Sequence, residues 1–240
     1  MARQKHLSLA CLLMLALSGC STPSAGSLAQ NDPWESTNRD VFAADVWLEH
    51  NIAQPLAEGY RAVLPEIARR GVHNAVTNLR GPIVLANDVL QARPEEAAQT
   101  LGRVVVNSTA GVGGLIDVAG KLGIPYHDND FGITLGRAGA GPGYYLVLPV
   151  LGPRPPRDLV GGVVDGAFDP LTWSRFDGRG TLLTVRTAAT ILDTANRTLD
   201  QFQSVERSSI DFYASTRSLY RQSRDAQIEG QGATMAMPDF

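Results

Sequence analysis

Apolar residues recur at helical spacing along most of the chain. One stripe repeats every four residues and comprises Leu48, Ile52, Leu56, Tyr60 and Leu64. Pro55 lies inside that stripe, and its ring predicts a kink or a restart of the helix there. A second stripe, spaced 3-4-3-4-3, comprises Val185, Ala188, Leu192, Ala195, Leu199 and Phe202. Such stripes are typical of amphipathic helices that bury one face.

Two prolines mark further helix starts. Pro94 is followed by two glutamates, and Pro156 is followed by Arg157 and Asp158. Proline suits the first helical turn, where its missing N–H is no loss, and carboxylates favour the positive end of the helix dipole. Apolar residues from 210 to 220 predict one more helix. Because alternating strand patterns are scarce, the sequence predicts an all-α fold.

The first 19 residues have the features of an export signal. Arg3 and Lys5 form a basic start, and the apolar run 7–17 that follows is shorter than the roughly 20 residues that span a bilayer. The segment ends in Leu-Ser-Gly-Cys at 17–20, which resembles the lipobox of bacterial lipoprotein precursors. That resemblance implies that residues 1–19 are a lipoprotein signal peptide and that Cys20 becomes an acylated first residue. The alternative is an ordinary secretory signal with a chance cysteine.

The rest of the chain divides into three parts. Residues 20–30 are small and polar and predict a flexible tether. A helical domain is expected over 31–225, and a polar, disordered tail over 226–240. Ser21 stands where lipoprotein sorting treats aspartate as a retention signal for the inner membrane, so the lipobox resemblance implies export to the outer membrane. No transmembrane helix is expected in the mature chain.

Charge and cysteine content narrow the class of protein. The 240 residues carry 21 Lys and Arg against 24 Asp and Glu, a net charge of −3, which excludes a nucleic-acid-binding protein. Of the two cysteines, Cys11 leaves with the signal peptide, so no disulfide can form within the mature chain. The 240 residues are enough to form one sizeable domain, and 44% of them are hydrophobic and can supply its core.

Glycine is concentrated in the middle of the chain. Eleven of the 24 glycines lie between Gly102 and Gly143, although each glycine inside a helix costs about 1 kcal/mol relative to alanine. Close contact between helices and a movable loop over 139–143 are both open explanations. The apolar run 144–151 is either an interfacial segment, with its paired tyrosines at the headgroup level, or a buried core segment.

Motifs for catalysis are missing from the sequence. It has no G-x-S-x-G, Walker A or H-E-x-x-H motif. The histidines that follow the signal, His50, His73 and His127, are far apart. The run His-Asp-Asn-Asp at 127–130 offers carboxylates to a cation, but a turn or helix cap is the more common use of such a run. We therefore expect no enzyme, no metal site and no cofactor apart from the acyl chains on Cys20.

An ordered set of short segments resembles the MlaA/VacJ family of outer-membrane lipoproteins. The set covers about residues 31 to 220 and comprises 31–35, Asn38-Arg39, 78–80 with Pro82, 87–88 with 90–91, Arg103, 107–109, 113–114, 117–119, 130–132, 134–136, Tyr145, 148–149, 152–153, 157–158 and 169–171. Each segment alone is weak evidence, but the whole set in order is strong.

The resemblance implies both a fold and a function. The fold is a ring-shaped, monotopic helical bundle in the inner leaflet of the outer membrane, beside trimeric porins. Phospholipids that reach the outer leaflet would pass through an amphipathic channel in the ring to the periplasmic phospholipid carrier of the Mla pathway, which maintains lipid asymmetry. The alternative is a scaffold lipoprotein that docks on porins without transport.

The same resemblance implies a gating hairpin loop. Its residues are Gly139, Gly141, Gly143, Tyr144 and Tyr145. The family commonly has Gly-Pro-Tyr at the loop exit, whereas here the proline is Pro142. Because proline restricts the residue before it, this order predicts a different resting shape for the loop.

Two further groups of residues receive roles from the resemblance. Asn38, Arg39 and Phe42 are expected at the channel mouth, and a capping or ion-pair role at a helix start is the open alternative for Asn38 and Arg39. Arg103 and Asp117 are expected to form a structural pair that closes the ring, and lipid contact is the open alternative.

Replacing the acylated cysteine tests the anchor directly. Cys20→Ala removes the only thiol of the mature chain, so the protein should carry no acyl chains and should mislocalise. Mass spectrometry of the purified protein and membrane fractionation measure the two effects. A variant that keeps normal outer-membrane function would contradict the lipobox interpretation.

Overall fold

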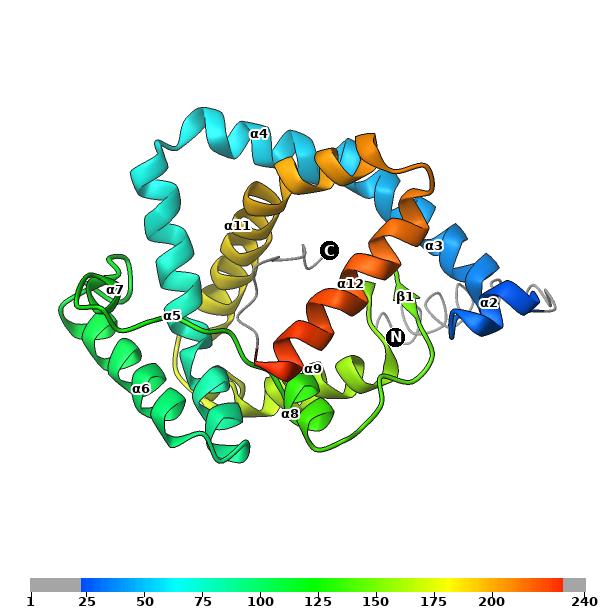
Figure 1. Cartoon of the computed structure of the whole chain (residues 1–240). Coiled ribbons are helices and arrows are strands. Elements are labelled where there is room, and N and C mark those ends of the chain that lie inside the picture. Colours follow the sequence, from blue (N-terminus) through cyan, green and yellow to red (C-terminus); the bar gives the residue numbers. More distant parts are fainter. Residues whose placement is uncertain (1–22, 231–240) are drawn as a thin grey trace, which may run out of the picture.

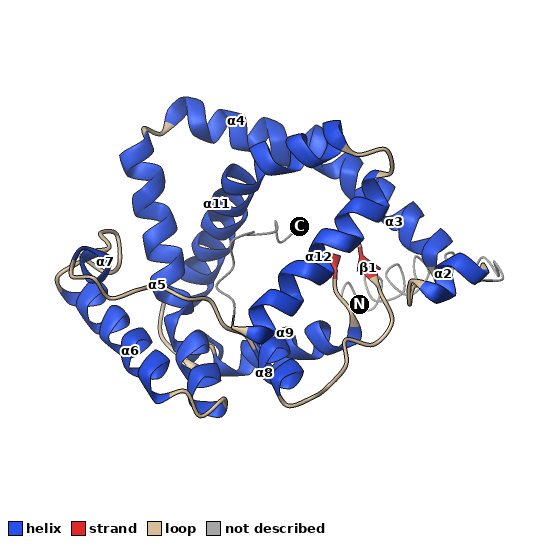
Figure 2. Cartoon of the chain, viewed as in Figure 1, coloured by secondary structure: helices blue, strands red, loops and turns tan. Residues whose placement is uncertain are grey.

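The computed structural model describes residues 23–230, so the predicted signal peptide and Cys20 lie outside the described residues. The described chain is mostly helical (Figure 2). Its elements are α2 (Ala25–Ala29), α3 (Glu35–Leu48), a π-helical turn (Glu49–Ala53), α4 (Gln54–Val63), α5 (Glu66–Leu90), α6 (Pro94–Thr109), α7 (Val118–Lys121), α8 (Phe131–Arg137), β1 (Val147–Leu148), β2 (Gly152–Pro153), α9 (Pro156–Phe168), α10 (Pro170–Trp173), α11 (Arg179–Ser208) and α12 (Phe212–Glu229).

The helices follow one another around a ring (Figure 1). α3 and α4 form its upper side, α5 descends on the left, α8 and α9 lie along the lower side, and α12 runs on the right from beside α3 down to α8. The long helix α11 packs against both α4 and α5, and α6 packs on the outer side of α5. Each helix therefore has few neighbours, and the arrangement depends on the contacts that join the two ends of the chain.

The N-terminal segment and α12 make the contact that closes the ring. The carboxylate of Asp32 accepts hydrogen bonds from the hydroxyl of Tyr213 (2.5 Å) and from Nη1 of Arg217 (2.6 Å). These partners lie 181 and 185 positions away in the sequence. Nearby, Arg39 of α3 pairs with Asp211 just before α12 (2.7 Å). The first and last parts of the described chain are thus held together by charge.

A second charged cluster joins α8, α9 and α12. Arg224 donates to Asp130 (2.7 Å) and to Asp158 (2.8 Å), and Asp158 also accepts from the Tyr220 hydroxyl (2.7 Å) and from Arg157 (3.0 Å). Burial alone would raise the pKa of Asp158, but Arg224 and the other donors hold that pKa below its usual value. The cluster therefore stabilises the fold at neutral pH and loses that contribution as the pH falls below about 4.

The apolar core is small and divided, and much apolar surface is exposed. One core cluster comprises Val41, Phe42, Tyr145, Val147, Tyr213 and Tyr220, and another comprises Ala57, Ala195 and Leu199. Among the described residues, exposed large apolar side chains outnumber the buried apolar ones and include all three tryptophans. Within residues 23–230, every helix is too short or too polar to span a bilayer. So much exposed apolar surface marks an interaction surface.

Several predicted helix boundaries are confirmed. Pro94 and Pro156 stand in the first turns of α6 and α9, and α12 covers the helix predicted from the apolar residues of 210–220. Pro55 is the second residue of α4, one residue after the π-helical turn, so the helix changes its hydrogen-bonding pattern beside the predicted place.

The stripe predicted along α11 is buried over only half its length. Ala195 and Leu199 lie in the core against α4, whereas Val185 is 59% exposed. The spacing of apolar residues correctly predicts the helix, but it does not distinguish a face covered by protein from a face left open.

The all-α prediction is wrong for one short hairpin, in which β1 and β2 pair antiparallel (Figure 2). The turn between them is closed by a hydrogen bond from the N–H of Leu151 to the carbonyl of Leu148 (3.2 Å). Pro149 occupies the second position of the turn, and Val150 takes the left-handed φ of +70° that a type II turn requires. Strands of two residues are too short to show an alternating pattern in the sequence.

Both ends of the domain are more helical than predicted. α2 lies within the expected tether 20–30, because the side chain of Ser24 caps it by accepting a hydrogen bond from the N–H of Ser27 (3.0 Å). α12 continues into the expected tail 226–240, because Arg137 of α8 donates to two carbonyl oxygens in its last turn. The remainder of that tail, from 231, lies outside the described residues.

The α8–α9 contact depends on glycine. A Cβ at Gly161 would lie 2.5 Å from the backbone nitrogen of Gly132 and 2.8 Å from its Cα, so one helix would have to move. Gly161→Ala should therefore lower the free energy of unfolding, by about 1–3 kcal/mol, as measured by chemical denaturation. The control is Gly162→Ala, whose Cβ meets nothing within 4 Å, and which should not destabilise the fold. Equal losses in both variants would contradict the close contact.

Candidate functional site

The predicted gating loop lies between α8 and β1. α8 ends in a Schellman motif, in which the N–H of Ala140 bonds to the carbonyl of Leu135 (2.9 Å) and Gly139 takes a φ of +91°. Gly143 also takes a left-handed φ, of +79°. Gly141 is different, because its φ is not left-handed and a Cβ there would meet nothing within 4 Å. Two of the glycines are thus required by the backbone, and the third lies in open space.

The exit of the loop is bonded to the N-terminal segment. Nδ2 of Asn31 donates to the carbonyl of Gly143 (2.8 Å), and the N–H of Tyr145 donates to the carbonyl of Asn31 (2.9 Å). Asn38 then binds the next residues, donating to the carbonyl of Tyr145 (3.0 Å) and accepting from the N–H of Val147 (3.0 Å). The backbone from 143 to 147 is therefore fixed by two asparagines.

Asp32 lies at the centre of these contacts. Its carboxylate is fully buried and accepts from Nδ2 of Asn38 (2.8 Å) as well as from Tyr213 and Arg217 of α12. Burial raises the pKa of Tyr213, and Asp32 raises it further, so the hydroxyl remains a donor. Burial alone would lower the pKa of Arg217, but Asp32 raises it above its usual value. The loop exit therefore rests on the same ion pair that closes the ring.

The structure places the other predicted mouth residues beside this centre. Arg39 pairs with Glu35 (2.8 Å) and with Asp211, so it has the ion pairs of the alternative prediction. Phe42 is buried, with its ring edge-to-face on Tyr213 at 5.5 Å between centroids. Phe42 thus belongs to the core, whereas the side chain of Arg39 is 39% exposed.

The two tyrosines at the loop exit have different environments. Tyr144 is 54% exposed, whereas Tyr145 is 1% exposed and belongs to the core. Of the two alternatives left open for this segment, Tyr145 therefore has the buried core position, and Tyr144 has an exposed one. Successive residues of an extended segment point to opposite sides, which explains why neighbouring tyrosines separate in this way.

Sequence reasoning missed a second contact between α3 and the hairpin. The N–H of Val150 donates to Oδ1 of Asp45 (2.7 Å), while Oδ2 of Asp45 is buried and has no hydrogen-bond partner among residues 23–230. Burial raises the pKa of Asp45. A left-handed φ is a genuine outlier for a β-branched residue such as Val150. Asp45 stands seven residues after Asn38, on the same face of the helix, and that spacing could have revealed it.

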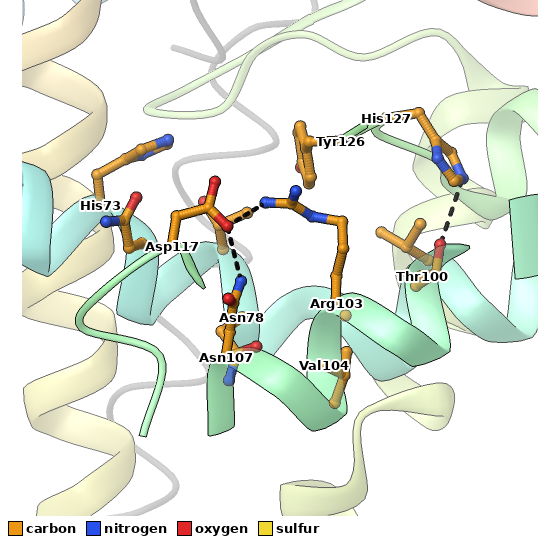
Figure 3. Close-up of a pocket in the computed structure, with 13 residues that line it drawn as sticks. His73, Asn78, Thr100, Arg103, Val104, Asn107, Asp117, Tyr126 and His127 are labelled. Carbon is orange, nitrogen blue, oxygen red and sulfur yellow. Dashed lines mark hydrogen bonds and ion pairs between the residues drawn. The ribbon is translucent and has the colours of Figure 1, made fainter. Parts of the chain in front are cut away.

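A small pocket lies between α5, α6 and the segment after α7, and the predicted pair of Arg103 and Asp117 lines it (Figure 3). Arg103 pairs with Asp117 (2.9 Å) and donates to the carbonyl of Ile124 (2.6 Å), and Asn107 also donates to Asp117 (3.0 Å). The ion pair forms, but it holds the α7 segment to α6. The expectation that it closes the ring is corrected, because Asp32 and α12 do so.

The pocket encloses about 130 Å³, well below the roughly 300–1,000 Å³ of ordinary ligand pockets, so a phospholipid does not fit in it. Near it, Asp88, Glu96 and His127 bring ligand atoms within 4.8 Å of one another and could hold a metal ion. The oxygens of Asp88 already accept from Thr100 (2.7 Å), Asn129 (2.8 Å) and His127 (2.9 Å). Asp88 and His127 thus belong to one hydrogen-bond network, and Glu96 pairs with Arg93.

The run 127–130 has the turn and cap roles that the sequence favours. Asp130 caps α8 by accepting a hydrogen bond from the N–H of Ile133 (2.8 Å), and Asn129 points back to Asp88. These side chains fix the start of α8, and with it the start of the glycine-rich loop.

A model of a known protein family matches most of this chain. The model of the MlaA lipoprotein family matches residues 30–227, which covers the whole ring. The chain belongs to the MlaA lipoprotein family. The resemblance found in the sequence is thereby confirmed. The prediction that the chain is not an enzyme is also confirmed, because its family is one of transport lipoproteins.

Individual MlaA relatives agree with this assignment. The chain is 32% identical over 232 residues to the intermembrane phospholipid transport system lipoprotein MlaA of Escherichia coli K12. The alignment covers 94% of this chain and 89% of that protein. It is 35% identical over 208 residues to a protein of Rickettsia felis, covering 85% and 80% of the two chains. A solved structure concerned with maintenance of bacterial outer-membrane lipid asymmetry matches with a TM-score of 0.72 at 30% identity, over 82% of this chain and 98% of that one.

Asn38 should be essential for holding the loop exit of this MlaA-family ring. It is 1% exposed and makes hydrogen bonds to Asp32, Tyr145 and Val147, so Asn38→Ala leaves several buried groups unpaired. We expect the free energy of unfolding to fall by roughly 2–4 kcal/mol and the Val147 amide to exchange faster with deuterium. Asp45→Ala is the control, because it removes one bond at the exposed turn and should leave Val147 protected. Unchanged Val147 protection in Asn38→Ala would contradict this role.

Proposed function

We propose that this protein is a lipid-anchored lipoprotein of the outer membrane that takes phospholipids from the outer leaflet and passes them to a periplasmic carrier. The relative from Escherichia coli is named for intermembrane phospholipid transport, and the similar solved structure is concerned with outer-membrane lipid asymmetry. The anchor is the acylated Cys20. The protein lies in the periplasm-facing leaflet, beside trimeric porins.

The observation that carries this proposal is the exposed apolar surface of the ring. α9 exposes Val160 and Val163 (52% and 72%), α11 exposes Val185, and α6 exposes Leu101 and Val105. No helix of residues 23–230 could cross a bilayer, so these side chains fit a monotopic protein whose helices lie within one leaflet. Lipid would then cover surface that water would otherwise contact.

The ring of helices supports a transport role more than a scaffold role. A phospholipid has a polar headgroup and apolar tails, so an amphipathic channel through the ring would accommodate both parts. No covalent bond has to break, and none of the catalytic motifs sought in the sequence is present. A scaffold that only docks on porins needs neither a ring nor a glycine-rich loop.

The loop over 139–143 is the movable element of this proposal. Its exit is fixed by Asn31 and Asn38, as described above, so motion is confined to the part around Gly141. Asn38, Arg39 and Phe42 then act by holding the base of the loop, and the exposed side chain of Tyr144 lies at its exit.

Stiffening the loop tests the proposed function. In a strain that lacks the protein, phospholipid should accumulate in the outer leaflet, and the wild-type gene should reverse this. Gly141→Pro should fail to reverse it, because proline fixes φ and stiffens the loop. The fold should persist, because within residues 23–230 the N–H of Gly141 makes no backbone hydrogen bond that would be lost. The measurement is the amount of outer-leaflet phospholipid, at matched protein levels.

The matched control is Gly141→Ala, which meets no neighbouring atom and keeps a rotatable φ. It should restore asymmetry as the wild type does. Full restoration by Gly141→Pro would count against gating by this loop. A deletion strain with an intact, asymmetric membrane would favour the scaffold alternative.

A further inference from the structure

The N-terminal segment joins the proposed anchor to the loop exit over a short distance. Cys20 is four residues before Ser24, the cap of α2, so their Cα atoms are at most about 14 Å apart. Asn31 follows soon after the end of α2 and bonds to both Gly143 and Tyr145. The loop exit is therefore connected to the acylated residue by one short helix and a pair of hydrogen bonds.

Apolar and aromatic side chains are exposed along this connection. Leu28 of α2 is 56% exposed, Trp34 is 49% exposed and Tyr144 at the loop exit is 54% exposed. The rings of Trp34 and Tyr144 pack edge to face, with centroids 5.6 Å apart, although 110 residues of sequence separate them. In contrast, their neighbours Asp32 and Tyr145 are fully buried. Trp34 and Tyr144 thus form an exposed aromatic pair beside a buried junction, and Leu28 is exposed on the helix that leads to it.

A cation lies next to this junction. Nη2 of Arg221, on α12, donates to the carbonyl of Gln30 (2.5 Å), and its guanidinium lies 5.3 Å from the ring of Tyr145. Tryptophan and tyrosine beside a basic side chain are typical of the membrane–water interface, where rings contact the acyl border and cations contact lipid phosphates.

We propose that Leu28, Trp34 and Tyr144 contact the interface of the bilayer that holds Cys20, and that this contact keeps the exit of the glycine-rich loop at the headgroup level. The inference rests on the proposed function, since it requires the acyl chains on Cys20. A lipid surface is the occupant because Ser24, the cap of α2, lies within about 14 Å of the anchored residue, and because an interface region about 5–8 Å thick suits amphipathic rings. The anchor then positions the loop as well as attaching the protein.

The depth of Trp34 tests this contact. In the acylated full-length protein, Trp47→Phe and Trp173→Phe leave Trp34 as the only tryptophan. The protein is incorporated into vesicles of phosphatidylethanolamine and phosphatidylglycerol that carry bromine on the acyl chains, either near the glycerol or near the methyl end. We expect bromine near the glycerol to lower Trp34 fluorescence at least about twofold, and bromine near the methyl end to lower it less.

Vesicle sedimentation distinguishes failure of the proposed membrane contact from failure of the proposed lipid-anchored function. If the acylated protein sediments with the vesicles but neither bromine position quenches Trp34, this contact is overturned while the anchor stands. If the acylated protein stays in the supernatant, the anchored function and the contact are both overturned.

A pair of tyrosine variants in the same single-tryptophan background tests the role of the junction. Tyr144→Ser removes the ring that packs on Trp34 and should reduce quenching by the shallow bromine. Tyr126→Ser is the matched control, because Tyr126 is also about half exposed (48%) but lies by the pocket of α5 and α6. Quenching should be unchanged in the control, and equal reductions in the two variants would overturn the proposal. Circular dichroism confirms that each variant is folded.

Discussion

The ring depends on one buried carboxylate, that of Asp32. It has no access to solvent, and it is compensated by Arg217 and by hydrogen bonds from Tyr213 and Asn38. Breaking such a pair by removing one partner costs about 3–5 kcal/mol, because an uncompensated charge is left in the interior. The N-terminal segment and α12 are therefore stable only together. Since Asn38 also holds Tyr145, the position of the loop exit follows from the closure of the ring.

This closure explains why a protein with a small apolar core can hold an open arrangement of helices. Charged and polar contacts join the helices at two places on α12, so the apolar side chains of α6, α9 and α11 need not be buried against other helices. In water that surface would favour aggregation, whereas in one leaflet of a bilayer it is covered by lipid. The exposed apolar surface that would favour aggregation in water therefore suits the ring to the function proposed for it.

Local features were predictable from the sequence, and distant contacts were not. Pro94 and Pro156 mark helix starts by their own chemistry, and the ordered short segments identified the family before any geometry was known. By contrast, Asp32 meets Arg217 across 185 positions, and no local pattern marks such a pair. The hairpin at Pro149 was missed because its strands have two residues each.

The most direct test of transport through the ring is to determine whether phospholipid itself occupies it. Acylated protein would be extracted from membranes in mild detergent, and the phospholipid that remains bound would be identified by mass spectrometry and exchanged against isotope-labelled phospholipid. We expect bound phospholipid that exchanges with the added label, and slower exchange when Gly141 is replaced by proline. A folded, acylated protein that carries no phospholipid and takes up none would contradict transport through the ring and leave a scaffold role.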